Sequence, residues 1–184
     1  MRYAGDDAAG RVDGHLDRAV EALPGQRLAS LVVVFGNPAF VATAAVALSL
    51  LCLVRRRFRM AALALGGPGL TGLLTTFGKP VVDRTIGYQD GLAFPSGHTG
   101  GATSLALVVA LLLAAELGLR PAATAGLAGL AAVLAGGAVG TGMVVIGSHY
   151  PTDVIGGFCA ATAAVLTIAL VLDATVRQRA PAAA

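Results

Sequence analysis

The chain has 184 residues, of which 56% are hydrophobic and 12% are charged, and its mean hydropathy is +0.78. These values exclude an ordinary soluble domain and indicate a membrane protein with a single domain. The formal net charge of +3 is small, and the arginines lie beside apolar segments, so the lipid bilayer is an expected partner and nucleic acid is not.

Residues 1–27 are predicted to form an extracytoplasmic or interfacial segment. Within it, residues 8–23 have a helical period, with Asp13 outside the apolar face. The apolar face comprises Val12, Leu16, Ala19, Val20 and Leu23. This pattern predicts a short amphipathic helix on the membrane surface, and a loosely ordered tail is the alternative.

Five apolar stretches approach the roughly 20 residues that a helix needs to cross the hydrocarbon layer. They lie near residues 30–54, 60–78, 98–118, 121–147 and 152–172. We therefore expect an all-α, polytopic transmembrane helix bundle of about five spans within residues 28–173, followed by a cytoplasmic tail at 174–184. Pro38 is expected to end a leading turn or to kink the first span. The fourth span is rich in glycine and alanine, which predicts close packing of neighbouring helices.

The distribution of arginines predicts the orientation of the spans. Seven arginines fall on one side of a five-span bundle: Arg55, Arg56, Arg57, Arg59, Arg120, Arg177 and Arg179. By the positive-inside rule this side is cytoplasmic. The loop at 79–96 and the turn around His149 are then expected on the outer side.

The stretch Pro95 to His98, "PSGH", directly precedes the third span. Ser96 is a suitable N-cap, so the amides of Gly97 and His98 would point outward from a helix start, where the helix dipole favours an anion. A simple cap beside an interfacial histidine is the alternative interpretation.

The stretch Gly147 to Gly157, "GSHYPTDVIGG", precedes the fifth span. Asp153 follows His149 by four residues, close enough for a carboxylate to orient the imidazole and leave its other nitrogen free as a nucleophile or base. A purely structural polar pair is the alternative, although a carboxylate at the start of an apolar span is costly.

Two cations, Lys79 and Arg84, lie in the predicted loop after the second span. Alone they are typical of side chains that extend toward lipid headgroups. Together with the helix start and the two histidines, they predict a phosphate site in which one histidine attacks phosphorus and the other protonates the leaving oxygen. Asp83 and Asp90 are the carboxylates that a metal centre would use, but no acidic cluster accompanies them, so we expect neither a metal nor a cofactor.

From Lys79 to Gly157 the chain resembles the type 2 phosphatidic acid phosphatase (PAP2) family, membrane lipid phosphatases that share a core with vanadium haloperoxidases. The order of the motifs agrees: a basic loop, PSGH at a helix start, then a histidine followed by an aspartate. The resemblance implies that His149 is the nucleophile that forms a phosphohistidine, that Asp153 orients it, and that His98 protonates the leaving group. It further implies that the phosphate is held by Lys79, Arg84, Ser96 and Gly97.

The chain departs from the family pattern in the first and third motifs. Ile86 stands where the family has an arginine, and Gly142 and Met143 stand where it has serine and arginine. The family also commonly has six spans. Arg27 or another N-terminal arginine is a candidate replacement, and without one the loss of such donors can reduce the rate by about 10²–10³ each.

These observations predict a metal-independent lipid phosphatase in a bacterial inner membrane, with its site on the extracytoplasmic side. The resemblance covers polyprenyl phosphates or diphosphates, our first expectation, and glycerolipid phosphates, our second. The frequent use of alanine, glycine and arginine is typical of a high-GC bacterial source, which adds polyprenyl-linked sugar phosphates as a further expectation. The alternative from another class is a non-catalytic or weakly active lipid-phosphate-binding protein or a small transporter component.

Overall fold

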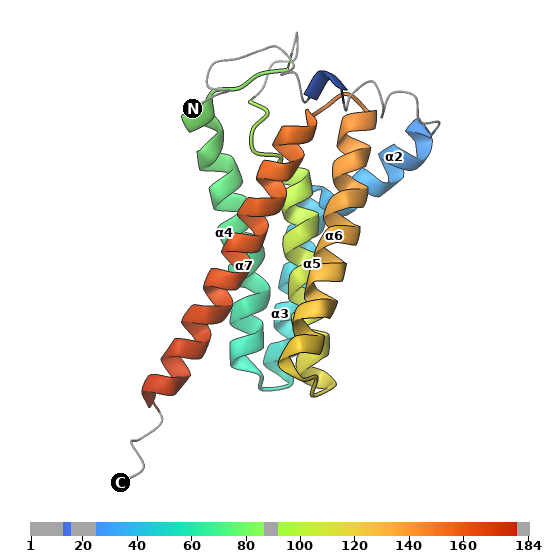
Figure 1. The fold of residues 1–184 in the computed structure, drawn as a ribbon. Helices are drawn as coiled ribbons and strands as arrows, with labels where there is room; N and C mark the ends of the chain where they lie inside the picture. Colours follow the sequence, from blue (N-terminus) through green and yellow to red (C-terminus); the bar gives the residue numbers. More distant parts are fainter. Residues whose placement is uncertain (1–12, 16–24, 87–91, 180–184) are drawn as a thin grey trace.

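A computed structural model describes residues 13–15, 25–86 and 92–179 of the chain. These residues form a bundle of helices (Figure 1). In chain order the elements are α2 (Gln26–Val33), the 3-10 helix η1 (Val34–Gly36), α3 (Pro38–Val54), α4 (Phe58–Val82), α5 (Gly97–Glu116), α6 (Pro121–Val145) and α7 (Pro151–Arg179). The predicted all-α class is confirmed. Helix α5 is central, because it contacts α3, α4, α6 and α7.

Within the described part of the chain, four helices are long and apolar enough to cross a membrane: α4, α5, α6 and α7. A fifth span is reached if α2, η1 and α3 count as one span with a 46° bend. The bend lies where Pro38 predicted it, since Pro38 opens α3 and the Asn37 side chain caps α3 by accepting the Ala39 amide at 2.9 Å. The protein is an integral membrane protein.

Helix α4 is longer than the sequence predicted. It continues through Pro80 to Val82 and ends at Asp83, which has a left-handed φ of 49°. Lys79 therefore lies in the last turn of α4, and its placement in the following loop was wrong. A proline inside a helix removes one backbone hydrogen bond and crowds the preceding turn, which can kink the helix without ending it.

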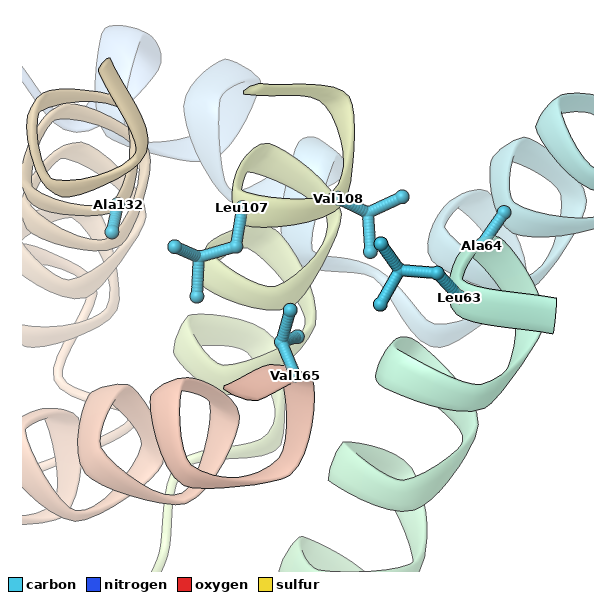
Figure 2. Packing of buried hydrophobic residues seen from close by; sticks show 6 residues of the cluster. All are labelled: Leu63, Ala64, Leu107, Val108, Ala132 and Val165. Carbon is cyan, nitrogen blue, oxygen red and sulfur yellow. The ribbon is translucent and has the colours of Figure 1, made fainter. Parts of the chain in front are cut away.

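The core of the bundle is a cluster of small and branched apolar side chains from four helices (Figure 2). It comprises Leu63, Ala64, Leu107, Val108, Ala132 and Val165. Many larger apolar side chains are instead exposed on the outer surface, for example Leu73, Leu130 and Leu170. This arrangement suits a protein whose surroundings are lipid rather than water.

The glycines of α6 bring this helix close to its neighbours, as its composition predicted. A Cβ atom at Gly136 would lie 2.4 Å from Thr103 Oγ1 on α5 and 2.8 Å from the Phe158 ring on α7. At Gly140 it would lie 2.3 Å from a Val154 methyl. Small residues therefore allow α6 to pack directly on α5 and α7.

The two ends of the bundle differ in composition. The α3–α4 turn, the α5–α6 turn and the end of α7 lie at one end (Figure 1), so the arginine-rich segments gather there as predicted. At this end Arg57 pairs with Glu116 and Arg59 pairs with Asp173. Residues 13–15, the described parts of the α4–α5 loop at 83–86 and 92–96, and the α6–α7 turn lie at the opposite end.

The N-terminal amphipathic helix predicted at residues 8–23 lies mostly outside the described residues. Residues 13–15 are helical. Asp13, which the sequence pattern left outside the apolar face of a surface helix, is fully buried.

Candidate active site

One cavity of about 460 Å³ is lined by four of the residues that the sequence predicted to act on phosphate. Its polar wall includes Lys79 from the last turn of α4, Gly97 and His98 from the first turn of α5, and His149 from the turn before α7. These residues come from three parts of the chain, and the helix ends that carry them meet at one end of the bundle. The predicted convergence of the two histidines on one cavity is therefore present in the structure.

The rest of the cavity wall is mostly apolar and comes from α3 and α4. It includes Val41 and Val46 of α3, and Leu65 and Pro68 of α4. The cavity thus joins a polar end, where the histidines lie, to an apolar part between α3 and α4.

The start of α5 has the predicted cap. Ser96 is buried, and its Oγ accepts the amide of Thr99 at 3.4 Å and lies 3.1 Å from Thr99 Oγ1. The first amides of an α-helix have no partner within the helix and so favour an anion, and Gly97 at this helix start lines the cavity. Ser96 does not line it, so the observed role of its hydroxyl is to cap the helix.

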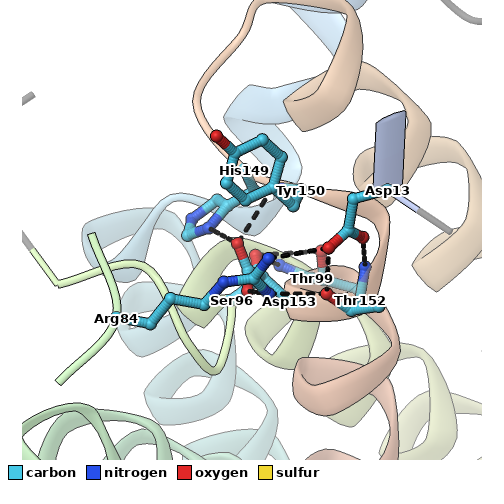
Figure 3. Close-up of polar contacts among 8 residues, drawn as sticks. All are labelled: Asp13, Arg84, Ser96, Thr99, His149, Tyr150, Thr152 and Asp153. Carbon is cyan, nitrogen blue, oxygen red and sulfur yellow. Dashed lines mark hydrogen bonds and ion pairs between the residues drawn. The ribbon is translucent and has the colours of Figure 1, made fainter. Parts of the chain in front are cut away.

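The Asp153 side chain is fully buried in the first turn of α7 and lies near His149. Its Oδ2 is 3.7 Å from His149 Nδ1, within ion-pair range but longer than a hydrogen bond (Figure 3). The same oxygen accepts the Tyr150 amide at 2.9 Å. Among the described residues His149 Nδ1 has no hydrogen-bond partner, so a small approach by Asp153 would complete the predicted pair.

Arg84 is fully buried behind Asp153 and does not line the cavity. Its Nη1 donates to Asp153 Oδ1 at 2.8 Å and to Thr152 Oγ1 at 2.6 Å, and its Nη2 donates to Asp13 Oδ2 at 2.7 Å. The guanidinium also lies 4.7 Å from the centre of the Tyr150 ring (Figure 3). The phosphate contact predicted for Arg84 is thus replaced in this structure by contacts to two carboxylates.

These partners stabilise the protonated form of the Arg84 guanidinium. Burial lowers the pKa of the guanidinium, but the hydrogen bond to Asp13 and the negative charges of Asp153 and Asp13 outweigh it and raise the pKa above its usual value. The group is therefore a permanent cation between two buried anions.

Asp13 is a residue that the sequence did not assign to the site. Its Oδ1 accepts the Thr152 amide at 3.0 Å, and its Oδ2 accepts Thr152 Oγ1 at 3.0 Å as well as Arg84 Nη2. The amide belongs to the second residue of α7, so Asp13 satisfies a donor that the helix start leaves open. No motif surrounds Asp13 in the sequence. Its burial, which marks it as part of the site, is visible only in the structure.

The backbones of the two histidine motifs are in direct contact. The Ser96 amide donates to the Asp153 carbonyl at 3.0 Å. A Cβ atom at Gly157 would lie 2.2 Å from the Ser96 carbonyl oxygen, and one at Gly156 would lie 2.5 Å from the Phe94 ring. The paired glycines after Asp153 therefore allow the start of α5 to rest on α7.

Apolar packing occupies the positions at which the resemblance expected further cationic and polar groups. Met143 is buried beside Ala102 and Val139, and a Cβ atom at Gly142 would lie 3.0 Å from a Val33 methyl on α2. Ile86 is half-buried in the α4–α5 loop.

Lys79 is the one cation that lines the cavity among residues 13–15, 25–86 and 92–179. Arg27, the candidate replacement, is exposed on α2 and does not line it. In the same ranges no three His, Cys, Asp or Glu side chains are grouped as metal ligands. Asp83 is exposed at the end of α4, and Asp90 lies outside the described residues.

The family comparison covers the polar wall of the cavity but neither Asp13 nor the part of the wall that α3 supplies. The PAP2 superfamily matches residues 71–177, which include Lys79, His98, His149 and Asp153. The chain belongs to the PAP2 superfamily. No curated protein matches it.

A solved structure has the same fold. It is the transmembrane PAP2-type phosphatidylglycerolphosphate phosphatase from Bacillus subtilis, with a TM-score of 0.70 and 21% sequence identity. The match covers 91% of the present chain and 85% of the other chain. The likeness of fold therefore extends over almost the entire chain.

Proposed function

We propose that this PAP2 protein removes phosphate from a membrane lipid by a metal-independent reaction at the outer face of a bacterial inner membrane. The observation that carries the proposal is that Lys79, His98 and His149 line one cavity with an apolar remainder. A lipid phosphate has the matching chemistry, because its head is anionic and its chain is apolar.

In the proposed reaction His149 attacks phosphorus through Nε2, forming a nitrogen–phosphorus bond as the bond to the lipid oxygen breaks. His98 gives its proton to the departing oxygen. Water then attacks the phosphohistidine while His98 takes up a proton, which releases inorganic phosphate and restores both imidazoles. Lys79 and the amides at the start of α5 would stabilise the charge on the phosphoryl oxygens.

The lipid chain is proposed to lie in the apolar part of the cavity, between α3 and α4. Polyprenyl phosphates or diphosphates are the first candidates, polyprenyl-linked sugar phosphates are related candidates, and glycerolipid phosphates are the second class. The outer location follows from the arginine distribution, since the site lies at the end opposite to the arginine-rich turns.

Phosphate release by the purified full-length protein in detergent, with EDTA present, tests the proposal. The substrates are short-chain phosphatidic acid, phosphatidylglycerolphosphate, and a short polyprenyl phosphate and diphosphate. We expect release with at least one of these, loss of release in His149→Ala, and no change in Thr175→Ala, an exposed residue near the far end of α7. If His149→Ala were as active as the parent protein, the proposed nucleophile would be wrong.

The second candidate function is lipid-phosphate binding without turnover. The observation that favours it is the single cation, Lys79, on the described cavity wall, because fewer cations would stabilise the transition state less. Saturable binding of a lipid phosphate with no phosphate release from any substrate would support this function and reject the phosphatase.

A further inference from the structure

We propose that Asp13 is a positioning residue for this site, acting through Arg84 and the start of α7 to hold Asp153 against His149. The inference rests on the proposed phosphatase function, and it assigns to the N-terminal segment a role that lies outside the matched PAP2 region. Asp13 itself does not line the cavity.

The Arg84 guanidinium lies between two carboxylates. Arg84 uses one guanidinium nitrogen for Asp153 and the other for Asp13 (Figure 3). The two carboxylates therefore hold the guanidinium from two sides. With Arg84 held, Asp153 has its Oδ1 on the guanidinium and its Oδ2 on the Tyr150 amide, toward His149. Both oxygens of the orienting carboxylate are thereby fixed.

Asp13 also contacts the backbone next to Asp153. Asp13 accepts both the amide and the hydroxyl of Thr152, the residue directly before Asp153. An acidic cap on this first helical turn also interacts favourably with the helix dipole. Asp13 thus contacts both groups that set the position of Asp153, namely its side-chain partner and its neighbouring backbone.

Asp13 also changes the net charge beside His149. Asp13, Arg84 and Asp153 are all fully buried, so their interactions are weakly screened. Arg84 alone would neutralise Asp153, whereas the three groups together carry one net negative charge. This charge stabilises the positive charge that His149 acquires when its nitrogen bonds to phosphorus. Asp13 therefore balances the charge of Arg84, and one net negative charge remains beside His149.

The test measures kcat and KM of the full-length protein with its best lipid phosphate. Asp13→Asn keeps an oxygen for the Thr152 amide but removes the charge, and a lost hydrogen bond to a charged partner corresponds to roughly a 10- to 100-fold decrease in kcat. We expect KM to change less than about threefold, because Asp13 lies outside the cavity wall, and Asp13→Glu to restore part of kcat. The matched control is Asp83→Asn, an exposed aspartate at the same end, whose kcat should equal that of the parent protein.

A double variant separates positioning from folding. If Asp13 acts through Arg84, adding Asp13→Asn to Arg84→Met should lower kcat much less than adding it to the parent protein. The Arg84→Met background lacks the guanidinium that Asp13 pairs with, so comparing Arg84→Met with the double variant provides the test if Asp13→Asn alone does not fold. An undiminished effect of Asp13→Asn in the Arg84→Met background would overturn the inference.

The outcomes distinguish this inference from the proposed function. An active parent protein, an inactive His149→Ala and a fully active Asp13→Asn would reject the role of Asp13 alone. A parent protein that releases no phosphate from any lipid would reject both.

Discussion

The amide of Ser96 donates a hydrogen bond to the carbonyl oxygen of Asp153 at 3.0 Å. This single bond joins the residue that caps α5 to the residue that lies beside His149. The two catalytic candidates, His98 and His149, are each close in sequence to one of the bonded residues. Their relative position is therefore set by contact between two backbones rather than by flexible side chains.

Gly157→Ala should disrupt this contact. The new methyl group would lie 2.2 Å from the Ser96 carbonyl oxygen, which cannot move without shifting the start of α5. Overpacking of this kind typically costs about 1–3 kcal/mol, and we expect a lower Tm and a large loss of phosphate release. Thermal unfolding in detergent and the release assay measure the two effects.

The matched control for that variant is Gly129→Ala on α6, where a methyl group would meet nothing within 4 Å. It should be neutral or slightly stabilising, because alanine has the higher helix propensity. Equal Tm values and activities for Gly157→Ala and Gly129→Ala would contradict the proposed importance of the α5–α7 contact.

Lys79→Met tests the only cation found on the described cavity wall. Removing one preorganised donor to a developing anion typically costs about 10²–10³ in rate, and we expect kcat/KM to fall by about this factor. Arg27→Ala is the comparison, because Arg27 is exposed and does not line the cavity. If Arg27→Ala were as damaging as Lys79→Met, Arg27 would have to reach the phosphate in the working protein.

Local sequence signals predicted the parts of the site that depend on helix ends. Ser96 before an apolar run predicts a cap, Pro38 predicts a break, and a four-residue spacing places Asp153 near His149; each of these features is present. The ends of helices can be predicted from nearby residues, because the backbone N–H and C=O groups that lack partners within the helix are often capped by side chains only a few residues away. The convergence of His98 and His149 followed because both were assigned to the same end of the bundle.

The partners of Arg84 could not be predicted in the same way. Asp13 lies 71 residues before Arg84, in a segment whose helical pattern placed this aspartate outside the apolar face. A charge in a sequence does not specify its partner, and buried pairing is decided by tertiary packing. The position of Lys79 was missed for a different reason, because the helix continues through Pro80.

Arg84→Met should destabilise the protein more than the loss of an exposed arginine. It leaves Asp13 and Asp153 buried without their cation, and breaking a buried pair typically costs about 3–5 kcal/mol. Arg57→Ala removes an exposed pair with Glu116, for which about 0–1 kcal/mol is typical. Unfolding in detergent measures both, and equal losses would show that the buried cluster contributes no special stability.

Gly72→Leu tests whether the lipid chain lies between α3 and α4. Gly72 lines the cavity, and a Cβ atom there would meet nothing within 4 Å, so a leucine side chain can occupy the apolar part without displacing the backbone. We expect kcat/KM for long-chain lipid phosphates to decrease while that for the shortest chains changes little, because only long chains compete with the leucine for this space. Gly126→Leu on α6 is the matched control, since Gly126 has equal room but does not line the cavity. A decrease of the same size for all chain lengths, or the same effect from Gly126→Leu, would place the lipid chain elsewhere.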